Sequence, residues 1–214
     1  MKLVDTITYS AALEKYGYYI EELRRICLET GEPVEGNCFY AHMNINMMIP
    51  QLYTKQQNLY SAGACSQNII EIGFNAGHSC LLFLISNPAS RITCFDICEH
   101  AYVEPCFNYL DKLFPGRLLL VRGNSLETLP AFAKQNDVKE VFDMAHIDGA
   151  HDKNVAHADF MNTWPLVKKG GLIIWDDTQD VELNGLCDGY VKDGYVSEEN
   201  VYETEVYKHR VLRK

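Results

Sequence analysis

The fold is decided by residues 68–79, which read NIIEIGFNAGHS. An apolar run ends at Glu71 and Gly73, and a second glycine, Gly77, precedes a segment with helical character. This order predicts a buried strand, a tight loop and a helix N-terminus, an arrangement that binds nucleotide-like ligands. Glycine lets the backbone turn sharply and approach a ligand closely. The same pattern is also compatible with a simple turn.

The composition describes an ordinary globular protein. The chain has 214 residues, of which 47% are hydrophobic and 22% are charged, so we expect one α/β domain with a substantial core. The net charge of −10 argues against nucleic acid or an anionic membrane as a partner. The apolar runs are too short to span a bilayer.

The eight cysteines show no CxxC spacing, and several lie in apolar runs. Because no signal peptide is recognisable, we expect reduced thiols and a cytoplasmic location rather than a disulfide framework. The spacings also argue against a zinc site.

From residue 68 onward, strand-like and helix-like segments alternate. We expect strands over residues 68–73, 91–96, 117–122, 141–147 and 171–175. We expect helices over residues 77–86, 102–114, 125–135, 152–164 and 180–192. Such alternation predicts right-handed βαβ units, and two further strand-like runs, 199–206 and 207–212, are expected to close the sheet as an antiparallel edge pair. The predicted fold is α/β, with a Rossmann-like, doubly wound, mostly parallel seven-stranded sheet.

The chain is expected to form a single domain over residues 1–214, with a cofactor-binding core at 67–214 and a helical N-terminal extension at 1–66. Within the extension, residues 11–30 have the apolar spacing of a helix.

The extension also contains a stretch rich in aromatic, methionine and asparagine side chains. Met47 and Met48 are expected in the core, whereas Tyr40, His42 and Asn44 have polar ends that suit either a pocket wall or the core.

In an open α/β sheet, ligands bind at the carboxyl ends of the strands. The second expected strand ends at Asp96, whose carboxylate suits the two hydroxyls of a ribose, or a turn or helix cap. The third is followed by Asn124 and Ser125, which suit an adenine edge or the cap of the next helix equally well.

Three carboxylates converge at the ends of the last two parallel strands. Asp148 follows one strand, and Asp176 and Asp177 follow the other, so without a cation they would raise one another's pKa. Oxygen ligands of this kind suit Mg²⁺. The alternatives are that Asp177 caps a helix and that Asp148 belongs to a turn. His151 suits a proton acceptor near this site or an ordinary surface histidine.

Together these motifs resemble those of class I S-adenosylmethionine-dependent methyltransferases. The narrower resemblance is to the cation-dependent O-methyltransferases, which include catechol O-methyltransferase and macrocin-type sugar methyltransferases. It covers about residues 55–214. The motifs that carry it span residues 71–79, 95–97, 123–125, 147–151, 169–171 and 175–177.

The resemblance implies S-adenosylmethionine as cofactor and Mg²⁺ or another divalent cation on Asp148, Asp176 and Asp177. It implies catalytic roles for His151 and Asp148. The cofactor-binding residues that it implies are Glu71, Gly73, Asn75, Gly77 and Ser79 around the methionine part, Asp96 at the ribose, Asn124 and Ser125 near the adenine, and Asp148.

The sequence departs from the family at three places. Asn75 replaces the usual middle glycine, which is tolerable because asparagine adopts left-handed conformations more readily than most residues. Asn124 replaces the usual acid. The first 54 residues match no part of the family, and since such an extension commonly forms the acceptor pocket, the acceptor stays open.

We therefore expect a divalent-cation-assisted O-methyltransferase acting on a small hydroxyl compound. One alternative is an NAD(P)-dependent Rossmann oxidoreductase, although the loop lacks a full GxGxxG and the pair Asp176 and Asp177 would have no role. Another is a non-catalytic S-adenosylmethionine-binding or scaffold protein. A nucleic-acid methyltransferase is disfavoured by the acidic charge. Assembly into a homo-oligomer stays open.

Overall fold

A computed structural model of the chain describes residues 1–135 and 137–214. Its longer helices are α1 (Thr6–Thr30), α2 (Tyr53–Ala64), α3 (His78–Ser86), α4 (Val103–Leu113), α5 (Ser125–Gln135), α6 (Lys153–Thr163) and α7 (Val181–Lys192). Its strands are β1 (Tyr40–Ala41), β2 (Asn44–Met48), β3 (Asn68–Ile72), β4 (Arg91–Asp96), β5 (Leu118–Arg122), β6 (Phe142–Ile147), β7 (Val167–Trp175), β8 (Ser197–Glu198) and β9 (Arg210–Arg213).

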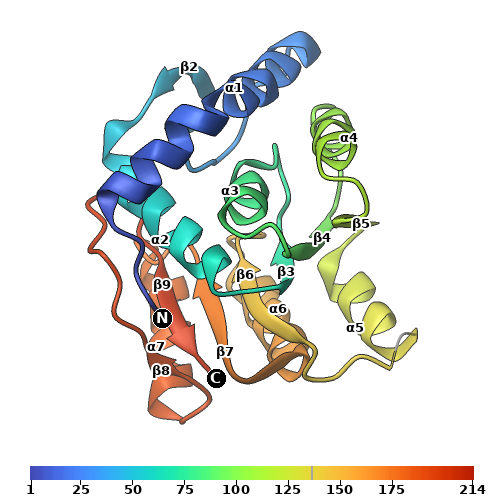
Figure 1. Cartoon of the computed structure of the whole chain (residues 1–214). Coiled ribbons are helices and arrows are strands. Elements are labelled where there is room, and N and C mark those ends of the chain that lie inside the picture. The colour runs from blue at the N-terminus through green and yellow to red at the C-terminus, as the bar shows by residue number, and fades with distance from the viewer. Residues whose placement is uncertain (136) are drawn as a thin grey trace.

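The main sheet has seven strands in the order β5-β4-β3-β6-β7-β9-β8 (Figure 1). The first five are parallel, and β9 pairs antiparallel with both β7 and β8. This arrangement confirms the predicted Rossmann-like fold with an antiparallel edge.

Helices cover both faces of the sheet, as expected for strands that are apolar on both sides. Neighbouring residues of β3 show this division: Ile69 packs in the core cluster that contains side chains of α1–α4, and Ile70 in the cluster that contains side chains of α5–α7. Both isoleucines are fully buried. None of the described helices is long and apolar enough to cross a membrane, and all eight cysteines are free thiols.

The bounds of the C-terminal strands differ from the prediction. Residues 199–206 form no strand, and the antiparallel edge pair consists of the short β8 and of β9. The reason is a side chain of α2: the Asn58 amide donates to the Tyr202 carbonyl at 2.7 Å and accepts from the Tyr202 N–H at 3.0 Å. These bonds take the place of strand pairing and hold the segment against the helix.

The prediction for the N-terminal extension was partly wrong, because β1 and β2 form a hairpin between its helices. Met47 and Met48, expected in the core, are 50% and 59% exposed. Within the described residues, β2 pairs only with β1 and buries only Ile45, so its other side chains have no layer to pack against.

Candidate active site

The loop between β3 and α3 adopts the sharp conformation that its glycines predict. Gly73 has a φ of +88°, and a Cβ there would lie 2.0 Å from the carbonyl oxygen of Asp148. Gly77 has a φ of +75° and precedes α3 without offering a side chain to cap it. Asn75 is left-handed with a φ of +51°, as its replacement of glycine requires.

The side chains of Asn75 and Asp96 fix this loop on both sides. The Asn75 amide donates to the carbonyls of Glu35 and Gly36, at 3.1 and 2.8 Å, and thereby joins the loop to the N-terminal extension. The Asp96 carboxylate accepts from the backbone N–H groups of Asn75 at 2.8 Å and Cys98 at 2.7 Å. Asp96 is therefore a turn-forming carboxylate beside the glycine loop.

A cavity of about 620 Å³ opens at the carboxyl ends of β3, β6 and β7. The expected site residues that line it are Gly73, Asn75, Ser79, Asp148, His151, Asp176 and Asp177. Those that do not line it are Glu71, Gly77, Asp96, Asn124 and Ser125.

The sequence left open whether Asn124 and Asp177 cap the helices that follow them, and the structure answers both questions. Asn124 accepts from the Leu126 N–H at 3.0 Å and so caps α5, whereas α7 is capped by Asp180 and not by Asp177. The carboxylate of Asp177 instead contacts His151, with 2.9 Å between Oδ2 and Nε2.

The N-terminal extension was expected to cap the acceptor side of the site, but the sequence did not show which of its residues form this cavity wall. Lys55 of α2 and residues 35–38 line the cavity, together with His42. His42 was one of the polar-ended candidates for a pocket wall, but nothing in the sequence pattern singled out Lys55.

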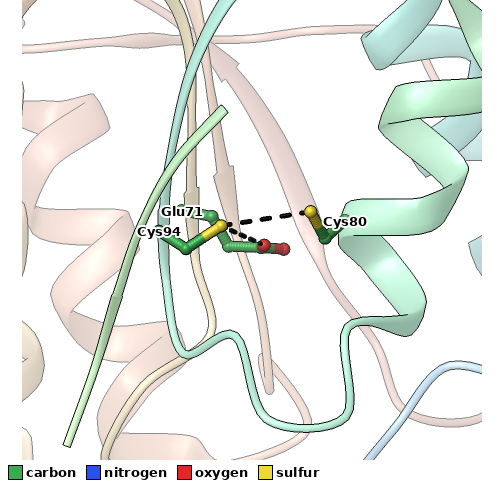
Figure 2. Close-up of side chains that lie close together, drawn as sticks. All are labelled: Glu71, Cys80 and Cys94. Atoms are coloured by element: carbon green, nitrogen blue, oxygen red, sulfur yellow. Dashed lines mark hydrogen bonds between the residues drawn. The ribbon is translucent and has the colours of Figure 1, made fainter. Parts of the chain in front are cut away.

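Glu71 lies beneath the cavity floor rather than in its wall. Its Oε1 accepts from Ser79 Oγ at 2.6 Å and lies 3.1 Å from His146 Nδ1, and Oε2 accepts from the Cys94 thiol at 3.5 Å. Figure 2 shows that the Cys94 thiol of β4 contacts both Glu71 and the Cys80 thiol of α3. Burial raises the pKa of both thiols.

A row of buried charged groups runs from Glu71 to the cavity. The His146 ring bridges Glu71 and Asp176, with Nε2 3.5 Å from Asp176 Oδ2. On its other oxygen, Asp176 accepts a 2.6 Å hydrogen bond from the Lys55 ammonium. Burial alone would lower the pKa of His146, but the carboxylates of Asp176 and Glu71 raise it to about 10. Negative and positive groups therefore alternate along the row.

Two side chains in the cavity wall titrate near neutral or mildly basic pH. Burial and the neighbouring Asp176 raise the pKa of Asp148 to about 7. The hydrogen bond to Asp177 raises the pKa of His151 to about 9, and since the His151 side chain is 66% exposed, water screens part of this effect. Both groups are positioned to exchange a proton with a ligand in the cavity.

The expected divalent ion can be tested against the positions of its ligands. Asp148, Asp176 and His146 bring one ligand atom each within 4.8 Å of one another, but Asp177 is not part of this group. An ammonium already lies on Asp176 Oδ1, and Mg²⁺ requires near-octahedral oxygen ligands at about 2.1 Å. The Mg²⁺ expected on Asp148, Asp176 and Asp177 therefore stays a prediction, and the Lys55 ammonium beside Asp176 is the observation that argues against it.

Comparison with known proteins gives the class of this chain. A family model described as a methyltransferase domain matches residues 70–178, about half of the chain. The match includes the glycine loop, Asp96 and Asp148, and also the two aspartates that follow β7, Asp176 and Asp177. The chain therefore belongs to this methyltransferase family, which confirms the class expected from its motifs. No curated protein matches the sequence.

Solved structures of O-methyltransferases share the fold. An O-methyltransferase from Bacillus cereus in complex with SAH is similar with a TM-score of 0.67 at 18% identity, covering 92% of this chain and 91% of that one. A putative caffeoyl-CoA O-methyltransferase from Staphylococcus aureus has a TM-score of 0.63 at 17% identity, with 97% and 99% covered. The TDP-rhamnose 3'-O-methyltransferase CalS11 has a TM-score of 0.58 at 20% identity, with 74% and 76% covered.

Proposed function

We propose that this protein transfers a methyl group from S-adenosylmethionine to a hydroxyl oxygen of a small acceptor. The observation that carries the proposal is the cavity at the carboxyl ends of β3, β6 and β7. Both the glycine loop and titratable side chains line this cavity. Its volume of about 620 Å³ lies in the range of small-molecule sites. The family match and the likeness to O-methyltransferases, one of them in complex with SAH, support the same reaction.

The cofactor is expected to lie along the glycine loop. Because Gly77 leaves the first turn of α3 without a side-chain cap, its backbone N–H groups are available to the carboxylate of the methionine part. Gly73 and Asn75 bring the loop backbone to the cavity wall, and Ser79 follows in the same helix. The bound cofactor supplies the electrophilic methyl group; the protein aligns the acceptor oxygen with it.

We assign the binding of the two ribose hydroxyls of the cofactor to Asp96. The adenine ring is assigned to the turn at Asn124 and Ser125. Each Asp96 oxygen accepts one backbone bond and retains a lone pair for a hydroxyl donor. Asn124 uses its carbonyl oxygen as a cap and keeps its amide N–H groups for a ring acceptor.

We assign proton removal from the acceptor to His151, with Asp177 holding the imidazole in place. A base must be neutral to accept the proton, so kcat/KM should rise with pH toward the His151 pKa. His151→Gln is expected to lower kcat by about 100-fold or more and to abolish this rise. If His151→Gln keeps the rise and Asp148→Asn loses it, the base is Asp148 instead.

The first test measures ligand binding without an acceptor. Thermal unfolding is followed with S-adenosylhomocysteine, with NAD, or with neither. A ligand of the folded state at about 100 times its Kd adds roughly 2.7 kcal/mol, which raises Tm by about 5–10 °C in a chain of this size. We expect this rise with S-adenosylhomocysteine alone. A rise with NAD alone would favour an oxidoreductase, and no rise with either would favour a scaffold protein.

A second test asks for methyl transfer itself. S-adenosylmethionine with a labelled methyl group is incubated with panels of phenolic, catecholic and sugar hydroxyl compounds, and labelled product is counted. The acceptor approaches from the side of His42 and residues 35–38, which belong to the N-terminal extension. The whole chain is therefore required in this assay.

A further inference from the structure

The side chain of Lys55 lies where the sequence placed a metal ion. Its ammonium group is 2.6 Å from Asp176 Oδ1, and both side chains are nearly inaccessible, at 7% and 1% exposure. Lys55 nevertheless lines the cavity, beside Asp148 and Asp177. The only hydrogen bond of this ammonium among the described residues is the one to Asp176, so two of its three N–H donors remain for a ligand.

Helix α2 fixes Lys55 in this position. Three further polar side chains follow it in the buried part of the helix, and each has a distant partner: Gln56 donates to the Cys38 carbonyl, Gln57 to the Val4 carbonyl and Asn58 to the Tyr202 carbonyl. Four consecutive buried polar residues with separate partners do not form a solvated helix face. Their contacts set the rotation of α2 and aim Lys55 at Asp176.

The charge on Lys55 is maintained by its surroundings. Its ammonium forms a 2.6 Å ion pair with Asp176, and both side chains are almost fully buried. A divalent ion bound by the same carboxylates would come within a few ångströms of a fixed ammonium. Because like charges repel strongly at such distances away from water, Lys55 and a divalent ion compete for one position.

We propose that Lys55 is the resident cation of this site and that the protein binds no divalent ion there. The ammonium holds Asp176, and through its free N–H donors it binds the acceptor oxygen as that oxygen loses its proton to His151. A neutral hydroxyl or its anion accepts such a hydrogen bond, so the acceptors are compounds whose hydroxyl reaches both Lys55 and His151. The statement about the acceptor rests on the proposed function; the statement about the ion does not.

The ion is tested by binding, without turnover. Isothermal titration with Mg²⁺, and the electron paramagnetic resonance signal of free Mn²⁺, are measured on the wild type, on Lys55→Met and on Lys55→Arg. Lys192→Met serves as the control, because Lys192 is an exposed lysine at the end of α7. We expect no saturable ion binding by the wild type, by Lys55→Arg or by the control, and at least about tenfold tighter Mn²⁺ binding by Lys55→Met.

The double variant Lys55→Met, Asp176→Asn should lose the Mn²⁺ binding that the single variant gains. Saturable binding of Mg²⁺ or Mn²⁺ by the wild type, abolished by Asp176→Asn, would overturn the proposal. If Lys55→Met does not fold, the wild-type titration alone decides.

Activity provides a separate test once an acceptor is found. Methyl transfer should be unchanged by EDTA, and Lys55→Met should lower kcat by about 100-fold while the Kd for S-adenosylhomocysteine changes less than about threefold. Loss of activity in EDTA that Mg²⁺ restores would overturn the proposal. Absence of methyl transfer under all conditions would refute the proposed function and leave the ion titration valid.

Discussion

We expect that adding one methyl group at Gly73 strongly destabilises the protein, because the glycine loop lies against the backbone at the end of β6. In Gly73→Ala, the new Cβ would lie 2.0 Å from the Asp148 carbonyl oxygen and 2.8 Å from the Asp148 carbonyl carbon. Both contacts are to backbone, so no rotamer change relieves them. The φ of +88° at Gly73 is a further strain for alanine.

The magnitude follows from two contributions. A left-handed backbone conformation costs alanine about 1–2 kcal/mol. Moving Asp148 away weakens the 3.0 Å bond from its N–H to the Ile72 carbonyl, and a buried unpaired polar group costs about 1–3 kcal/mol. The total, about 2–5 kcal/mol, corresponds to a Tm about 4–20 °C lower in a domain of this size.

Differential scanning calorimetry measures this change, and titration with S-adenosylhomocysteine measures the loss of cofactor binding. The matched control is Gly185→Ala in the middle of α7, where a Cβ meets no atom within 4 Å. Since alanine favours a helix over glycine by about 1 kcal/mol, the control should melt slightly higher than the wild type. A Gly73→Ala variant that melts within about 2 °C of the wild type and binds normally would refute the reasoning.

Two further predictions concern stability. His78 is buried without a hydrogen-bond partner among the described residues, and burial lowers its pKa to about 4. In the unfolded state the same imidazole takes up a proton below about pH 6.5. The free energy of unfolding therefore falls as the pH falls from 6.5 toward 4. His78→Phe should remove about 2 kcal/mol of the loss between pH 7 and pH 5 in urea unfolding; an unchanged loss would contradict this. Asp143 accepts from the N–H groups of Gln67 and Asn68 at 3.0 and 2.8 Å, so Asp143→Ala should destabilise the start of β3 by about 1–3 kcal/mol. A urea midpoint equal to that of the wild type would show that water replaces these bonds fully.

The parallel part of the sheet could be predicted because each signal is local. Ile69 and Ile70 form part of an apolar run bounded by glycine, and this pattern identifies a strand whatever it packs against. Topology then brings strand ends together, so Asp148, Asp176 and His151 were expected at one edge from the order of elements alone. The structure places all three in one cavity.

The remaining features depend on partners that are distant in sequence. The run at 199–206 has strand composition, but Asn58 binds its backbone from 144 residues away. Met47 has the character of a core residue, but its hairpin lies outside the main sheet, where no second layer covers it. Local patterns describe what a segment is able to form, and they do not show which surface reaches it.

Lys55 is the most consequential example of this limit. Three carboxylates at one edge would repel one another, so the sequence predicted a positive charge among them. The pattern did not show its source, because Lys55 lies 121 residues before Asp176 in a polar stretch that resembles a solvated helix face. A metal ion can be exchanged or removed, whereas a lysine supplied by the fold is present whenever α2 is in place. On this proposal the charge of the site is coupled to the folding of the N-terminal extension, the same segment that forms one wall of the cavity.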